Sequence, residues 1–233
     1  MRYFKQFGGK LTDELRAKYA ASPQWKKKKF FNYVKTGVDI KPWHVPKLIY
    51  RQLFEKKGRM PKEPLPVVAF DKEAFLAPSD KAKMVWFGHS VVLIRVGGLT
   101  ILIDPMFGPN AAPVAPFAVT RFSENTLDII DDLPQIDLML LTHDHYDHLD
   151  MASIEKLKPK IKKYYVALGA ARHLVEWGVS QEDIIEFNWW DFKSINGIVI
   201  TYTPTRHASG RAIRDQSCCL WGGWSLKSAN EKI

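Results

Sequence analysis

The segment from His143 to His148 contains three histidines and two aspartates in six residues, directly after the apolar run from Leu138 to Leu141. Histidine offers a neutral nitrogen and aspartate an anionic oxygen, a ligand set that suits Zn²⁺ and similar first-row cations. Several cationic imidazoles at this density would repel one another without a metal. The segment therefore predicts a metal site that begins where a buried strand ends, and it favours a metal-dependent hydrolase.

The spacing within this segment divides its ligands into two sets. His143 and His145 are two residues apart, so an extended backbone points both side chains the same way, and they can share one cation. Asp147 and His148 are adjacent and need a turn near Tyr146 to reach a second cation together. One hydroxide can bridge two cations that lie about 3.5 to 4 Å apart.

The pattern of apolar residues predicts a mixed α/β chain. From residue 83 onward, short β-rich runs come first as an antiparallel meander, turned at Gly97 and Gly98, and then alternate with helices. The predicted strands are 84–87, 91–96, 99–103, 137–141, 164–167, 184–187, 192–195, 198–203 and 218–226. The predicted helices are 12–21, 151–157 and 170–177, of which the first is capped by Thr12 and the second by Asp150.

The positive charge is concentrated near the N-terminus. Residues 1–65 carry 17 Lys and Arg against 5 Asp and Glu, whereas residues 66–233 carry 17 against 20, so the net charge of +9 comes from the first part. We expect a basic N-terminal arm at 1–65 that wraps a core domain at 66–233. The run Lys26 to Lys29, followed by Phe30 and Phe31, favours peripheral contact with an anionic membrane. A solvated loop is the alternative.

The sequence has no stretch close to the roughly 20 apolar residues of a membrane-spanning helix. Its first residues also lack the apolar core of a secretory signal. We therefore expect a cytoplasmic protein without a transmembrane segment, with association at a membrane surface as an addition. Cys218 and Cys219 are adjacent, so we expect no structural disulfide.

Seven segments, in order, resemble the metallo-β-lactamase superfamily and, within it, the branch that contains N-acyl-phosphatidylethanolamine-hydrolysing phospholipase D. These segments are SPQWKKKKFFN, WFGHS, ILIDPMF, THDHYDHLD, NWWD, TPTRHASGR and LWGGW. The HxHxDH pattern alone would indicate only a superfamily that includes lactamases, glyoxalases, nucleases and lactonases. The resemblance implies an αββα sandwich made of two similar halves, of which the second is incomplete here.

The resemblance also implies which residues bind metal. His143, His145 and the later His207 would bind one cation, while Asp147 and His148 would bind the other and act in catalysis. The alternative for His207 is an ordinary surface-loop histidine. Zinc is the expected metal, with two ions in a complete member of the family.

Three further residues are expected around the ligands. By resemblance, Asp104 orients a ligand histidine, a partner that metal-bound imidazoles generally need, and the alternative is an Asp-Pro turn. His89 in WFGHS is expected behind the ligands, facing the metal pocket, or else to be structural. Arg211 is expected to bind a phosphate oxygen of the substrate through its planar guanidinium, with a structural salt bridge as the alternative.

The family pattern continues beyond what this sequence contains. A Gly-Asp after a strand and a last histidine complete the second metal site in the family, and neither follows His207 here. We therefore expect a C-terminally truncated member, in which one metal is well supported and Asp147 and His148 form half of a second site.

The expected function is that of a metal-dependent phosphodiesterase, in which a metal-bound hydroxide attacks a phospholipid or another phosphodiester. Nucleic acid is not an expected substrate, because WFGHS differs from the Gly-rich strand signature of the superfamily's nucleases. The alternatives are a lactonase or nuclease with the same metal core. A catalytically impaired fragment that only binds metal or anionic lipid is a third reading.

Overall fold

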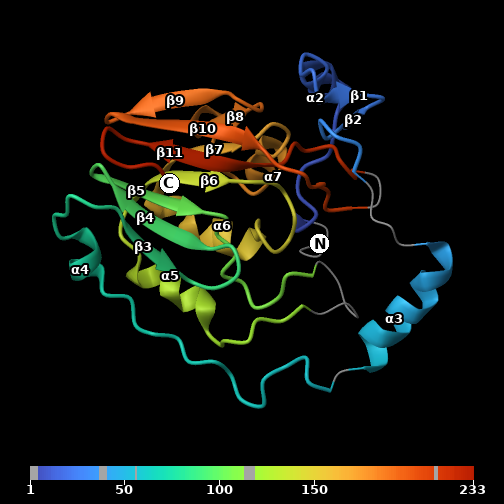
Figure 1. Ribbon diagram of the computed structural model, residues 1–233, viewed down its shortest axis with the longest axis horizontal. Helices are drawn as coiled ribbons and strands as arrows, with labels where there is room; N and C mark the ends of the chain where they lie inside the picture. The colour runs from blue at the N-terminus through green and yellow to red at the C-terminus, as the bar shows by residue number, and fades with distance from the viewer. Residues whose placement is uncertain (1–4, 37–40, 56, 113–118, 213–214) are drawn as a thin grey trace.

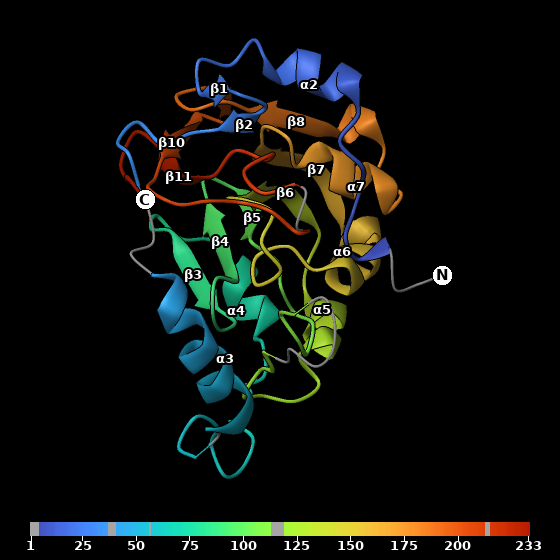
Figure 2. The same cartoon turned by 90° about the vertical axis from the view of Figure 1, so that its right-hand side faces the viewer.

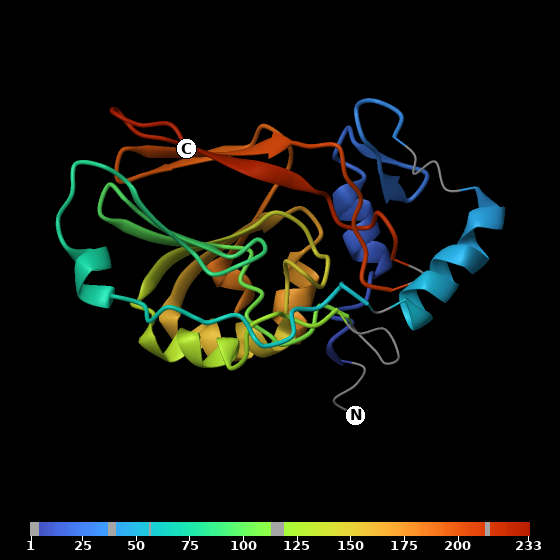
Figure 3. The same ribbon diagram turned by 60° about the horizontal axis from the view of Figure 1, so that its bottom comes forward.

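Two β-sheets pack against each other in the computed structural model, which describes residues 5–36, 41–55, 57–112, 119–212 and 215–233. The larger sheet has the strand order β3-β4-β5-β6-β7-β8, and the smaller one has the order β11-β10-β9. The smaller sheet lies on one face of the larger one, while helices α5 and α6 cover the other face (Figure 3). The mixed α/β class is confirmed, and the described residues form an αββ stack of layers.

The helices and strands have the following bounds. The larger sheet consists of β3 (Lys83–Trp86), β4 (Val92–Val96), β5 (Leu99–Ile103), β6 (Ile136–Leu141), β7 (Ile161–Ala167) and β8 (Ile184–Phe187). The smaller sheet consists of β9 (Phe192–Ile195), β10 (Ile198–Pro204) and β11 (Gly222–Lys227). The α-helices are α2 (Asp13–Tyr19), α3 (Val45–Phe54), α4 (Lys72–Leu76), α5 (Ile129–Asp132), α6 (Met151–Leu157) and α7 (Ala171–Glu176). The short strands β1 (Trp25–Lys26) and β2 (Lys29–Phe30) form a hairpin, and one-turn 3₁₀ helices lie at Pro42–His44, Thr126–Asp128, Lys158–Lys160 and Gln181–Asp183.

The direction of the strands places the metal-binding segment. Strands β3, β4 and β5 form the predicted antiparallel meander, and β5, β6, β7 and β8 then run parallel. Strand β6 is buried at every residue except Asp137, because it lies in the middle of the sheet between two layers. Parallel neighbours end at the same edge, so the residues after β5 and β6, Asp104 and Thr142, lie side by side.

The two sheets are joined close to this edge. The carbonyl oxygen of Thr142 accepts hydrogen bonds from Tyr202 Oη of β10, at 2.8 Å, and from Gly222 N of β11, at 3.1 Å. The Tyr202 ring packs on Trp224 with a centroid distance of 4.7 Å, and Trp224 reaches across to Phe187 of β8 at 5.0 Å. These contacts fix the loop after β10 opposite the loop after β6 (Figure 1).

The first part of the N-terminal arm packs on the core. Helix α2 begins at the predicted N-cap, where Leu15 N donates to Thr12 Oγ1 at 3.2 Å. The rings of Tyr19, Trp25 and Phe30 pack edge-on or tilted against one another, with centroid distances of 4.8 to 5.8 Å. The elements that carry them, α2, β1 and β2, lie next to strands β8 and β10 (Figure 2). Phe30 is therefore buried, and the expectation of an exposed aromatic pair beside the lysine run is wrong for this residue. The domain boundary at residue 65 stays a prediction.

Helix α3 was not predicted from the sequence. Its Pro46 reads as a helix breaker, yet it stands in the first turn, where proline is tolerated because the backbone N–H has no helical partner there. No residue of α3 is buried, and the helix stands apart from both sheets in two views (Figures 1 and 3). No helix among the described residues has the length and apolar character needed to cross a membrane.

The predicted last strand begins four residues too early. Strand β11 starts at Gly222, and Cys218 and Cys219 lie in the buried turn before it with free thiols. Hydrogen bonds hold this segment in place, since Cys219 N donates to Ser209 Oγ at 3.3 Å and Leu220 N donates to Leu168 O at 2.7 Å.

Candidate metal centre

Three histidine nitrogens converge at the edge where β6 ends. His143 Nε2 lies 3.0 Å from His145 Nδ1 and 3.0 Å from His207 Nε2, and His145 Nδ1 lies 3.3 Å from His207 Nε2. His143 and His145 come from the loop after β6, whereas His207 comes from the loop after β10, 62 residues later. The structure thus brings together the three residues that were predicted to share the first metal.

The spacing of these nitrogens fits a single cation. Zinc binds imidazole nitrogen at 2.0–2.1 Å, so two nitrogens of a tetrahedral site stand about 3.3 Å apart. The three observed separations are 3.0, 3.0 and 3.3 Å. A bound metal needs ligand nitrogens whose lone pairs point toward one position. If the three nitrogens carried protons instead, their N–H groups would face one another, which is unfavourable. We conclude that the three imidazoles fit a bound cation.

A second group of ligands adjoins the first. His89 Nε2 lies 2.9 Å from Asp147 Oδ2, and His148 Nε2 lies 3.7 Å from the same oxygen. The ring centroids of His148 and His143 are only 4.2 Å apart, so the two ligand groups are in direct contact. His89 was expected behind the ligands. Its contact with Asp147 is compatible with that position, and it also forms a candidate metal group with Asp147 and His148.

Asp104 holds His148 from behind. Its Oδ2 lies 2.8 Å from His148 Nδ1, while Thr142 donates its N–H to Oδ1 at 2.8 Å and its hydroxyl to Oδ2 at 2.7 Å. With Nδ1 engaged in this way, His148 presents Nε2 to the metal side. The backbone of Asp104 has φ +45°, a left-handed conformation that is costly for a residue other than glycine and is often found at functional sites. The contact between Asp104 Oδ2 and His148 Nδ1 is the one that an orienting role requires.

The metal-free site keeps most of its imidazoles neutral. Burial, reinforced by the nearby rings of His148, His145 and His207, lowers the pKa of His143 to about 2. Burial likewise lowers the pKa of His145 and of His207. At neutral pH these rings therefore carry the lone pairs that a metal needs. His148 differs. Burial lowers its pKa, but the hydrogen bond and the charge of Asp104 and the charge of Asp147 together outweigh burial, so the net pKa is raised.

Arg211 occupies a different place from the one that was expected. It is 3% exposed, and its Nη1 donates to the carbonyl oxygens of Asp144 at 2.8 Å and of Leu149 at 2.7 Å. The guanidinium also lies over the Tyr146 ring, 3.9 Å from its centroid. This geometry favours the structural alternative over a substrate contact. The bonds made by Arg211 fix both ends of the ligand loop rather than forming a salt bridge.

A third cluster of titratable side chains lies beneath the ligand loop. Asp144 is completely buried and accepts from Gly210 N at 2.8 Å, with His173 Nε2 at 3.2 Å from its other oxygen. Arg172 Nη2 lies 3.5 Å from both Asp144 and Asp215, so a guanidinium already stands where a cation between these carboxylates would bind. His173 of α7 is a buried partner of this network.

The loop that carries His207 is held by the N-terminal arm. Asn32 Nδ2 donates to His207 O at 2.8 Å, and Trp221 Nε1 donates to Asn32 Oδ1 at 2.8 Å. Reasoning from residue types missed Asn32, because an asparagine in a basic arm has no ligand chemistry of its own. The only signal was its place at the end of the SPQWKKKKFFN segment that resembles the family.

A family model described as a beta-lactamase superfamily domain matches residues 100–233. The chain belongs to this superfamily. N-acyl-phosphatidylethanolamine-hydrolyzing phospholipase D 1 of Caenorhabditis elegans is 29% identical over 158 residues, which cover 64% of this chain and 44% of that protein.

Other relatives of this superfamily member include an uncharacterized protein of Mycobacterium tuberculosis, 26% identical over 79% of this chain and 49% of its own length. A metal-dependent hydrolase of Saccharolobus solfataricus is 32% identical over 55% of this chain and 52% of its own length. Among solved structures, a metallo hydrolase of Ignicoccus hospitalis aligns with a TM-score of 0.49 and 23% identity, over 65% of this chain and 58% of that one. The chain spans about half the length of the curated relatives it matches.

We expect the Asp104→Asn variant of this superfamily member to bind metal at the second group more weakly by about 10- to 100-fold. The amide has one acceptor oxygen, so its NH2 group must face either Thr142 N or the pair formed by the Thr142 hydroxyl and His148 Nδ1, and the charge beside His148 is lost, so His148 is held less firmly. Competition with a chromogenic chelator measures the affinity. Asp128→Asn, at an exposed position on the opposite side of the sheet, is the control, and equal affinities for both variants would contradict the prediction.

The metal-free protein should lose stability as the pH falls below about 6.5. The pKa of His143 is lowered to about 2, and burial together with Arg172 lowers the pKa of His173 to about 3. Between these values and about 6.5 the unfolded chain binds two protons that the native protein excludes, so the free energy of unfolding falls with pH. His148, whose pKa is raised, acts in the opposite direction only above about 6.5, where the native protein holds a proton that the unfolded chain has lost, and it adds no slope below that pH. Urea unfolding across this range measures the slope, and His143→Asn should make it shallower.

Proposed function

We propose that this chain carries the metal site of a phosphodiesterase that hydrolyses glycerophospholipids. The observation behind the proposal is the presence of two ligand groups side by side, with the His143 and His148 rings 4.2 Å apart. Paired metal sites are suited to displacement at phosphorus, because they stabilise both the attacking and the leaving oxygen. The similarity to a phospholipase D of Caenorhabditis elegans supports a phosphodiester as substrate. We propose zinc, since the first group offers imidazole nitrogens at tetrahedral spacing.

The residues of the second group would act closest to the reaction. Bound cations would supply Lewis-acid chemistry and lower the pKa of an attacking water. Burial raises the pKa of Asp147, but His148 and His89 outweigh it and lower the net value, so Asp147 is a carboxylate at neutral pH. A carboxylate there can bind a cation or accept a proton, while Asp104 holds His148 in place. We therefore assign the catalytic roles to Asp147 and His148.

The test is a substrate panel with the purified, zinc-loaded chain. We expect release of a phosphatidic acid from an N-acyl-phosphatidylethanolamine in mixed micelles, and no product from RNA or from an acyl-homoserine lactone. The Asp147→Asn variant should lose at least about 100-fold of this activity, the scale of one transition-state interaction. Hydrolysis of the lactone or the RNA alone would favour the other superfamily activities. Metal binding without any turnover would identify a fragment that only binds.

We further propose that helix α3 contacts an anionic membrane. Its Val45, Leu48 and Ile49 form an exposed apolar stripe at helical spacing, and Tyr50 and Phe54 extend that stripe. Basic side chains border it, since Lys41, Lys47, Arg51, Lys57 and Arg59 lie within or beside the helix. A helix with an apolar face and a basic border lies in the interface of an anionic bilayer.

Vesicle sedimentation tests this contact. Wild-type protein should bind vesicles that contain phosphatidylserine and should not bind pure phosphatidylcholine vesicles. Ile49→Asp should weaken the binding at least tenfold, because it places a charge in the apolar stripe. Asn230→Asp, which adds the same charge at an exposed position outside α3, is the matched control. If both variants lost vesicle binding equally, electrostatic attraction alone would explain the binding. That result would contradict insertion of the apolar stripe.

A further inference from the structure

A tight turn after strand β3 carries His89 to the second ligand group. Val91 N donates to Gly88 O at 3.1 Å, and Phe87 N donates to Val91 O at 2.9 Å, so hydrogen bonds close the turn. His89 stands inside it with φ +47°, a left-handed conformation that is uncommon for a residue other than glycine. Such conformations persist only where the surrounding structure holds them, and they cluster at functional sites.

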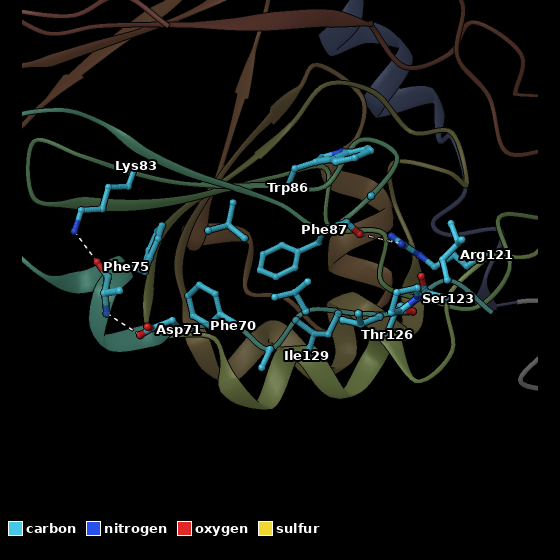
Figure 4. A pocket seen from close by; sticks show the side chains of 18 residues that line it. Phe70, Asp71, Phe75, Lys83, Trp86, Phe87, Arg121, Ser123, Thr126 and Ile129 are labelled. Carbon is cyan, nitrogen blue, oxygen red and sulfur yellow. Dashed lines mark hydrogen bonds between the residues drawn. The ribbon is translucent and has the colours of Figure 1, made fainter. Parts of the chain in front are cut away.

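Side chains next to the turn fix its position. Arg121 Nη1 donates to Phe87 O at 3.0 Å, which Figure 4 draws as a dashed line. Trp86 Nε1 donates to His89 O at 2.9 Å. In Figure 4, Trp86 and Phe87 lie together at the end of β3. The backbone of His89 is therefore held from both sides, although its own side chain is half exposed.

The His89 ring faces the ligand loop at a distance that fits metal binding. Its Nε2 lies 2.9 Å from Asp147 Oδ2, and His148 Nε2 lies 3.7 Å from the same oxygen. One ligand atom from each of these three residues lies within 4.8 Å of the other two. Ligand atoms of a tetrahedral zinc stand about 3.3 Å apart, so the two observed separations bracket the expected one. Ser90 Oγ also donates to Asp147 O at 3.0 Å and binds the turn to the ligand loop.

The donor set of the second group suits a cation. Two imidazole nitrogens with one carboxylate oxygen form a ligand set found at catalytic zinc sites and at mononuclear iron(II) sites. Asp104 engages Nδ1 of His148, which leaves the Nε2 of that ring for the metal. His89 and Asp147 also line a cavity of about 370 Å³, so the group has an open side, as catalytic metal sites require.

We propose that His89 is a direct ligand of the second cation, together with Asp147 and His148. Zinc usually takes at least three protein ligands, and Asp147 with His148 supplies only two. His89 thus turns the expected half of a site into a site with three ligands from this chain. The proposal rests on the paired metal sites of the proposed function. It gives His89 a bond to the cation, in place of the expected position behind the ligands.

Metal stoichiometry tests this assignment. The wild-type protein, freed of metal and titrated with Zn²⁺, should bind two equivalents. His89→Asn should bind the second at least about 100-fold more weakly, since losing a ligand costs more than losing an orienting partner. Asparagine tolerates the left-handed backbone at this position, but its side chain is shorter than that of histidine. A single equivalent in the wild type, or two equally tight equivalents in His89→Asn, would overturn the proposal.

His44→Asn is the matched control for the titration. His44 is an exposed histidine outside the metal groups found among the described residues, so this variant should bind both equivalents like the wild type. A loss of the second equivalent in His44→Asn as large as that in His89→Asn would also count against a specific role of His89.

Two further measurements separate a ligand from a hydrogen-bonded neighbour of Asp147. The ¹⁵N resonance of His89 Nε2 should shift with the second equivalent of Zn²⁺ and not with the first. His89→Gln keeps a side-chain N–H that can donate to Asp147 and should still lose the second equivalent. Retention of that equivalent in His89→Gln, or a His89 Nε2 resonance that does not respond to Zn²⁺, would give His89 a positioning role only and overturn the proposal.

This proposal and the proposed function fail in distinguishable ways. Metal binding is measured without substrate, so two equivalents of zinc without hydrolysis of any phospholipid would refute only the proposed function. Phospholipid hydrolysis by a wild-type protein whose His89 Nε2 stays free of the metal would refute only the assignment of His89.

Discussion

The His143→Ala variant is expected to bind zinc at least about 100-fold more weakly than the wild type and to lose the hydrolytic activity proposed above. Loss of an orienting partner alone costs about 10- to 100-fold in affinity, and removing a ligand outright costs more. His143 is the central ligand, because its Nε2 is 3.0 Å from both other nitrogens of the first group. Without it, His145 and His207 supply two ligands where zinc usually takes at least three.

Elemental analysis after gel filtration measures this loss. His44→Ala is the matched control, since His44 is an exposed histidine outside the metal groups found among the described residues. His207→Ala should resemble His143→Ala in metal content, although His207 is exposed and its removal should cost little stability. A full equivalent of zinc on His143→Ala would show that the three imidazoles do not form the first site.

Local sequence patterns predicted the elements that hold the metal ligands. The apolar run before His143 is the buried strand β6, and α6 begins after Asp150, whose carboxylate accepts from Ser153 N at 2.9 Å. Both depend on neighbours within a few residues, so a short window contains the necessary information. The same holds for the antiparallel meander, which is fixed by a glycine turn.

Long-range placement was harder to predict. Nothing in WFGHS says that His89 meets Asp147, because that contact depends on how β3 and β4 lie beside the loop after β6. Arg211 follows a ligand histidine closely in sequence, yet the turn at Gly210, with φ +135°, directs it beneath the ligand loop. His207 was predicted as a ligand from the family resemblance. Spacing alone could not have linked it to His145, which lies 62 residues earlier.

The largest loss of stability is expected from Asp144→Ala. The carboxylate is completely buried and is shared by Gly210 N, His173 and Arg172, the last of which is also buried. Removing it leaves Asp215, at 3.5 Å, as the remaining acidic partner of Arg172, and leaves Gly210 N and His173 Nε2 without the oxygens they face. Breaking a buried ion pair on one side costs about 3 to 5 kcal/mol, which is a large share of the stability of a typical domain.

The comparison of three variants separates charge from shape in this network. Asp144→Asn keeps an acceptor for Gly210 N but loses the charge that faces Arg172, so it should cost less than Asp144→Ala. Asp128→Ala, at an exposed position with only a 3.5 Å contact to Lys156, should change stability by at most about 0.5 kcal/mol. Urea unfolding of the metal-free proteins measures all three.

Because Asp144 lies between His143 and His145, its loss should also loosen both ligands, and zinc affinity should fall together with stability. Wild-type zinc affinity in a destabilised Asp144→Ala protein would mean that the network supports the fold without positioning the ligands.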